Sequence, residues 1–225
     1  MKEIDNSMIK WKKRNFLQKV TMLFWIFFIG SIIGYVIESI VGIVQNGHFV
    51  SRQGLLFGPF IPVYGVGLAI YYLVISLIKQ KKNWKIFLLS MLLGGMVEYF
   101  FSFFQESLFG TISWDYSHLL FNLHGRTSLL HCIYWGIGGV LFVRFLLPLI
   151  ERMKLWQKNS YFKWITTVCL LFMMFDIVIS GMVGIRQLER KNNVAAKDYM
   201  DYYFDIHYPD TKLEKIFSNT KAVTK

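Results

Sequence analysis

Residues 20–44 read VTMLFWIFFIGSIIGYVIESIVGIV, an apolar stretch that contains one charged side chain, Glu38. A helix needs about 20 apolar residues, at about 1.5 Å each, to cross the hydrocarbon core of a bilayer. This stretch is therefore predicted to span a membrane. Further long apolar runs follow at 55–78, 86–104, 129–150 and 165–185. We expect an all-α integral membrane protein with about five transmembrane helices in a domain over 20–185.

The composition supports this class. The 225 residues are 54% hydrophobic and only 17% charged, whereas soluble domains average about 45–50% and about 25%. With 17 Gly, four Pro and two Cys, the chain has neither a collagen-like nor a disulfide-rich composition. No Walker A, GxGxxG or HExxH motif occurs, so we predict no cofactor and no metal site.

The net charge of +11 is distributed as in a helical membrane protein. Lys and Arg number six in residues 1–19, one in 45–54, four in 79–85, one in 105–128 and four in 151–164. This alternation predicts a cytoplasmic N-terminal segment, 1–19, and outer loops at 45–54 and 105–128. The aromatic residues lie within the apolar runs, which argues against nucleic-acid binding.

The C-terminal tail, residues 186–225, departs from this alternation. It carries eight Lys and Arg residues, although an odd number of spans places it outside. Tyr199, Tyr202, Tyr203 and Ile206 would share one face of a short helix. Such an amphipathic tail is expected to lie at the membrane surface or to pack on the loops.

The second apolar run begins irregularly. It contains a loop motif of Gly58, Pro59, Pro62, Tyr64 and Gly65. Proline is tolerated in the first turn of a helix, where no amide partner is lost. We therefore expect a loop or half-inserted segment over 47–61 and a helix from about Pro62.

An internal repeat is visible in the sequence. Small residues at four-residue spacing lead to Glu38 in the first run and, 60 positions later, to Glu98 in the third. An Arg followed at a short distance by two leucines comes after each, at Arg52 and Arg126. The pattern predicts a duplicated two-helix unit with both copies oriented alike in the membrane.

Charged residues inside the apolar runs require partners. A carboxylate at the bilayer centre costs about 2.5–3.5 kcal/mol on insertion scales. We expect Glu38 and Glu98 to face the bundle interior and to pair with Arg52 or Arg126. This cluster either fixes the helix register or binds a substrate, ion or proton.

The connection over 105–128 is the other unusual segment. A loop of this length in a small bundle is typical of a functional role. Its polar and aromatic candidates for binding are Glu106, Trp114, Asp115, Tyr116, Asn122 and Arg126. Asp115 has histidines nearby, but their spacing matches no known metal motif.

These segments also carry a family resemblance. NGHFVSR at 46–52, LFGPFIPVYG at 56–65, WDYS at 114–117 and FNLHGR at 121–126 resemble the bacterial family called putative ABC-transporter permeases (type IV, CmpB-like). Where members usually read Asn-Arg-Gly, this chain has Ser51, Arg52 and Gln53. The resemblance covers roughly residues 25–150 and implies a multi-spanning bacterial plasma-membrane protein. Because this chain has no nucleotide-binding domain, ATP-driven transport would need a separate ATPase subunit.

Three functions remain open from the sequence. The first is a transport-associated subunit with a polar Glu/Arg site toward the outer leaflet. The second is a membrane-embedded enzyme acting on a lipid or cell-envelope precursor, with the 105–126 loop over the same cluster. The third is a scaffold that recruits a partner. The lipid bilayer is the one certain environment, and a homo-oligomer is compatible with all three functions.

Overall fold

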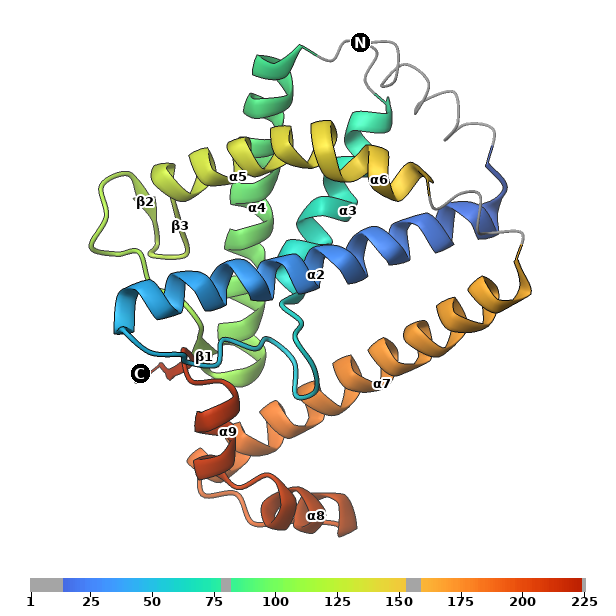
Figure 1. Ribbon diagram of the computed structural model, residues 1–225. Coiled ribbons are helices and arrows are strands. Elements are labelled where there is room, and N and C mark those ends of the chain that lie inside the picture. Colours follow the sequence, from blue (N-terminus) through green and yellow to red (C-terminus); the bar gives the residue numbers. More distant parts are fainter. Residues whose placement is uncertain (1–13, 78–81, 153–158, 224–225) are drawn as a thin grey trace.

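The computed structural model describes residues 14–77, 82–152 and 159–223, and they are mostly helical (Figure 1). Residues 1–13, 79–81 and 153–158, parts of the three predicted basic segments, lie outside this range. The helices are α2 (Phe16–Asn46), α3 (Pro62–Leu77), α4 (Asn83–Phe109), α5 (Leu129–Leu141), the π-helical turn η1 (Phe142–Leu146), α6 (Leu147–Arg152), α7 (Ser160–Lys191), α8 (Tyr199–His207) and α9 (Asp210–Ile216). The strands are β1 (Thr111–Ile112), β2 (Asn122–Leu123), β3 (Thr127–Ser128) and β4 (Lys221–Ala222).

Four helical segments of the described chain are long and apolar enough to cross a membrane: α2, α4, Leu129–Glu151 and α7. The fifth predicted span, 55–78, is a loop followed by the 16-residue α3. At about 1.5 Å per residue, α3 is about 24 Å long, shorter than a hydrocarbon core of about 30 Å. The protein is thus an all-α membrane protein in which one apolar run is only partly helical.

The long helices begin and end at recognisable caps. The Asn15 side chain accepts from the Gln18 amide at 2.9 Å, and the Gln18 side chain accepts from the Asn15 amide at 3.2 Å. Gly47 ends α2 with φ of 72°, and Gly110 ends α4 with φ of 60°. This left-handed conformation is strained for residues that carry a Cβ.

Helices α2 and α3 form one crossing pair and α4 and α5 form another, joined through contacts between α3 and α4, while α7 contacts α4. Gly34 lies directly against the Tyr64 ring, and Gly94 lies directly against the Trp135 ring. Gly94 follows Gly34 by 60 residues, and Trp135 follows Tyr64 by 71. The same two offsets relate two further contacts: Gly65 with Phe27 to Gly136 with Phe87, and Gly30 with Leu68 to Ser90 with Gly139.

Buried polar groups join the helix ends on one side of the molecule. The Arg14 guanidinium donates to the Tyr72 hydroxyl at 2.5 Å and to a Glu151 carboxylate oxygen at 2.7 Å. The side chains of Arg14 and Glu151 are only 1% and 7% exposed. This triad ties the start of α2 to the ends of α3 and α6.

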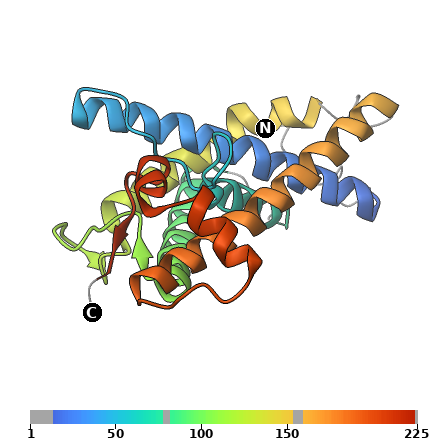
Figure 2. The same cartoon turned by 90° about the horizontal axis from the view of Figure 1, so that it is seen from below.

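The loops at 47–61 and 110–128 meet the C-terminal tail at the opposite side (Figure 2). Strand β1 pairs antiparallel with β4, with Thr111 opposite Ala222. The Ser51 hydroxyl donates to the Ile216 carbonyl at 3.0 Å. The tail therefore packs on the two loops, one of the alternatives expected from its sequence.

Several basic residues of the tail form ion pairs with acidic residues of the same segment. Arg186 lies 2.8 Å from an Asp205 oxygen, and Arg190 lies 2.6 Å from an Asp210 oxygen. Lys197 lies 2.9 Å from a Glu189 oxygen. The Arg186 guanidinium lowers the pKa of the Asp205 carboxyl. These pairs balance much of the positive charge of the tail within its own fold.

Candidate functional site

Glu38, near the C-terminal part of α2, is paired with a cation. Arg52 Nη1 lies 3.0 Å from Glu38 Oε2, and the Tyr64 hydroxyl donates to Oε1 at 2.7 Å. Arg52 also donates from Nη2 to the Gln45 side chain at 2.7 Å. A Cβ at Gly42 would lie 3.1 Å from Arg52 Nε, so the small residue leaves room for the guanidinium. These contacts fold the 47–61 loop back onto α2.

Glu98, on α4, is held without a cation. The residue is 7% exposed. The Thr127 hydroxyl donates to Oε2 at 2.7 Å, and the Tyr116 hydroxyl donates to Oε1 at 3.2 Å. No Lys or Arg in the described part of the chain forms an ion pair with this carboxylate. Among the described residues, this carboxylate is therefore held by neutral hydrogen-bond donors.

The two carboxylates belong to one cluster, which we call the polar cluster: Glu38, Arg52, Tyr64, Glu98, Tyr116 and Thr127. Tyr116 connects its two halves. Burial raises the pKa of the Tyr116 phenol, the nearby charges of Glu98 and Glu38 raise it further, and Arg52 opposes them. Between the helix pairs, the Tyr64 and Trp135 rings are 5.2 Å apart. With two carboxylates and one guanidinium, the cluster has one negative charge in excess when both acids are ionised.

Two helices begin beside this cluster. The Ile61 amide, just before α3, donates to the Ser31 carbonyl midway along α2 at 3.0 Å. Thr127, just before α5, contacts Glu98 midway along α4. Helix α5 therefore begins beside Glu98, and α3 begins against α2 at the level of Ser31.

Arg126 does not pair with Glu98, its expected partner, and instead forms an ion pair with Glu106. Its guanidinium lies over the Tyr99 and Phe103 rings, 5.5 Å and 5.3 Å from their centroids. Arg126 lies in the turn before β3 and reaches α4 through Tyr99, Phe103 and Glu106, whereas Thr127, the first residue of β3, contacts Glu98.

Other residues singled out in the sequence shape the 110–128 loop. Asp115 accepts from the Ser117 amide at 2.9 Å, and this hydrogen bond lowers the pKa of its carboxyl. Asn122 accepts from the Gly125 amide at 3.0 Å and donates to the Leu119 carbonyl at 2.8 Å. The Trp114 indole donates to the Arg126 carbonyl at 2.8 Å. These contacts organise the hairpin and do not reach the polar cluster.

The 47–61 loop is stabilised from α7. Asp176 accepts from the Phe57 amide at 3.1 Å, and the Ser180 hydroxyl accepts from the Leu56 amide at 2.8 Å. Asp176 is fully buried. Irregular backbone within a membrane protein needs such partners. In the same loop, Gly58 has φ of 73°, Pro59 is exposed and Pro62 opens α3.

Several residues that build these contacts were not identified from the sequence. Thr127 follows Arg126 in the sequence, and no sequence pattern indicates that its hydroxyl contacts Glu98. Arg14 lies in a basic run whose other members looked equivalent, and Glu151 ends an apolar run. Arg14 and Glu151 are 137 residues apart in the sequence, beyond the reach of any local pattern, so only the fold reveals that they pair.

Comparison with known proteins gives one match. Residues 25–181 match the model of a family described as "Putative ABC-transporter type IV". The match includes Glu38, Arg52, Glu98 and the 110–128 loop. No curated protein and no solved structure matches the chain significantly.

Proposed function

Because the chain belongs to the putative ABC-transporter type IV family, we propose that it is the permease-like membrane subunit of a transporter. In this proposal the polar cluster is the substrate site, and it lies toward the outer leaflet. The protein resides in a bacterial plasma membrane with its N-terminus in the cytoplasm. A separate ATPase subunit would supply the energy.

The matched contacts of the two helix pairs support a duplication. We infer that α2–α3 and α4–α5 are two copies of one unit, oriented alike in the membrane. The polar cluster draws Glu38 from one copy and Glu98 from the other. Transporters built from repeats commonly place their substrate sites at the repeat interface, near helices that begin within the membrane.

Glu98 is the observation that carries the proposal. A carboxylate used only to fix helix register needs a lasting counter-charge, as Glu38 has in Arg52. Glu98 is buried without one. A proton, a cation or a cationic group on a substrate would supply the missing charge. The excess negative charge of the cluster therefore favours cationic substrates.

Uptake into proteoliposomes tests this function. The purified protein would be tested against labelled metal cations, amines and cationic amino acids, with its ATPase where one co-purifies. A compound taken up by the wild type should lose most of its uptake with Glu98→Gln. The matched control is Glu106→Gln, which changes a carboxylate outside the cluster and should leave uptake unchanged. Equal uptake by both variants would refute the assignment of Glu98.

One observation also favours an enzyme as the second candidate. The imidazole of His131 stacks on the Tyr116 ring with centroids 3.6 Å apart, and Tyr116 donates to Glu98. Titratable groups that converge beneath a loop could transfer protons during a reaction on a lipid-linked precursor. In that case neither the wild type nor the Glu98→Gln variant would show uptake, and the wild type but not the variant would convert a lipid extract.

A further inference from the structure

Helix α8 leaves one face uncovered. Tyr199, Tyr202 and Ile206 are 79%, 58% and 74% exposed, and Met200 and Tyr203 lie on the same side. At 100° per residue these positions form one continuous stripe. We call them the α8 aromatic face. It contains no Asp, Glu, Lys or Arg, and His207, whose ring centroid is 4.3 Å from that of Tyr203, is its one titratable imidazole. On a soluble surface it would be an unusually apolar patch for a helix of this length.

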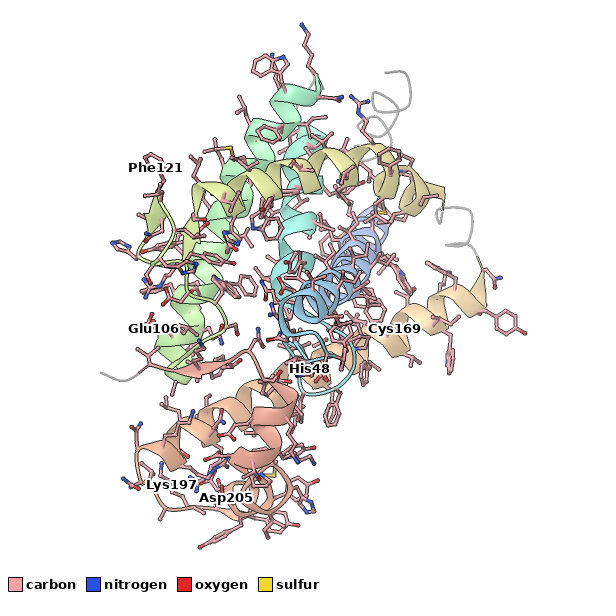
Figure 3. All side chains as sticks on the ribbon, turned by 60° about the vertical axis from the view of Figure 1, so that its left-hand side comes forward. His48, Glu106, Phe121, Cys169, Lys197 and Asp205 are labelled. Carbon is pink, nitrogen blue, oxygen red and sulfur yellow. The ribbon has the colours of Figure 1, made fainter. Side chains whose placement is uncertain are left out.

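The opposite side of α8 is fixed to the end of α7. Phe204 is 2% exposed and packs in a cluster with Leu56 and Val183. Asp205 binds Arg186 and Arg190 on the last turns of α7. Figure 3 shows Asp205 and Lys197 together at this end of the molecule. The position of α8 along α7 is therefore set by buried and ionic contacts, and its aromatic face is held outward.

The apolar surface of α7 extends to the turn that holds α8. With 32 residues, α7 is about 48 Å long, which exceeds a hydrocarbon core of about 30 Å. Over the last two turns before Arg186 the helix exposes apolar side chains: Val178 is 60% exposed and Ile185 is 48% exposed. The lipid-facing surface of α7 thus reaches the turn to which α8 is attached, so the apolar surface continues onto α8.

We propose that the α8 aromatic face lies in the interfacial region of the bilayer and anchors the tail to the membrane. Tyrosine is suited to this region because its ring is apolar and its hydroxyl can remain hydrated. Since the face carries no Lys or Arg, it binds zwitterionic lipid without needing anionic headgroups. Helix α9, whose Leu213 is 1% exposed and packs on the loops, stays out of the lipid.

Depth-dependent quenching tests the proposal on the full chain. Cys132 and Cys169 are replaced by serine, and a fluorophore is attached through Ile206→Cys. A matched protein carries it through Glu214→Cys on α9. Both are reconstituted in phosphatidylcholine vesicles that contain lipid with a nitroxide near the glycerol. We expect at least threefold stronger quenching at position 206 than at 214, unchanged by 1 M salt.

Equal quenching at the two positions would overturn the proposal. So would rapid disulfide-linked dimer formation by unlabelled Ile206→Cys, because it would show that a second copy covers the face. Gel filtration checks that each labelled protein remains folded. Tyr202→Cys repeats the measurement on the same face, and strong quenching there supports the interfacial position independently of residue 206.

Discussion

The two carboxylates of the polar cluster differ in what balances their charge. Glu38 faces a guanidinium and a phenol, whereas Glu98 faces two hydroxyls. Removing one partner of an ion pair strands the other, and removing both restores neutrality. Substitutions at Glu38 should therefore act mainly on stability, and substitutions at Glu98 mainly on function.

A double-mutant cycle tests how much the Glu38–Arg52 ion pair contributes to stability. Glu38→Gln or Arg52→Gln alone should lower the unfolding free energy by about 1–3 kcal/mol, because a partly buried charge loses its partner. The double variant should regain a large part of this loss. Thermal unfolding in detergent measures the stability of each variant. For Arg126 and Glu106, whose carboxylate side chain is 34% exposed, smaller effects are expected. Strictly additive losses at Glu38 and Arg52 would contradict the pairing.

Asp176 permits a second test at the residue scale. Asp176→Leu removes the acceptor for the Phe57 amide and should cost about 1–3 kcal/mol. Asp176→Asn keeps an acceptor oxygen and should cost less. The readout is the labelling rate of a cysteine placed at Phe57, which should rise with Asp176→Leu. An unchanged rate would show that α7 does not hold the loop.

At the scale of helices, close contacts at glycine position the two pairs. A Cβ at Gly34 or Gly94 would overlap an aromatic ring, whereas one at Gly138 would meet nothing within 4 Å. Gly34→Ala and Gly94→Ala should each destabilise the protein by about 1–3 kcal/mol. Gly138→Ala should be neutral or stabilise it by up to about 1 kcal/mol through helix propensity. Thermal unfolding of the three variants checks this, and a neutral Gly94→Ala would contradict the packing.

Part of this arrangement of helices and loops could be predicted from the sequence. Helix positions, the loop before Pro62 and the Arg52–Glu38 contact follow from hydropathy, proline chemistry and the cost of buried charge. The partner of Arg126 does not, because it depends on how the 110–128 hairpin is placed along α4. The ion pairs of the tail escaped prediction for a related reason. A count of Lys and Arg says nothing about acidic partners that a fold brings to them.

For the whole molecule, the decisive prediction is which side of the membrane each loop faces. A cysteine at Ser117 should react with an impermeant maleimide added to intact cells, and one at Lys82 should react only after permeabilisation. Both native cysteines are replaced by serine in each protein. The expectation follows from the alternation of basic segments. The reverse pattern would invert the orientation and would place the polar cluster toward the cytoplasm.

The repeated glycine contacts have an evolutionary consequence. If the two pairs descend from one duplicated unit, as proposed above, these contacts would have held each pair together, and two copies of that unit would have carried chemically identical carboxylates. Fusing the copies into one polypeptide would have let each change separately. Glu38 now faces Arg52, whereas Arg126, at the corresponding place after Glu98, pairs with Glu106. A single fused gene could then specify two unlike acids where a symmetric ancestor could specify only two alike.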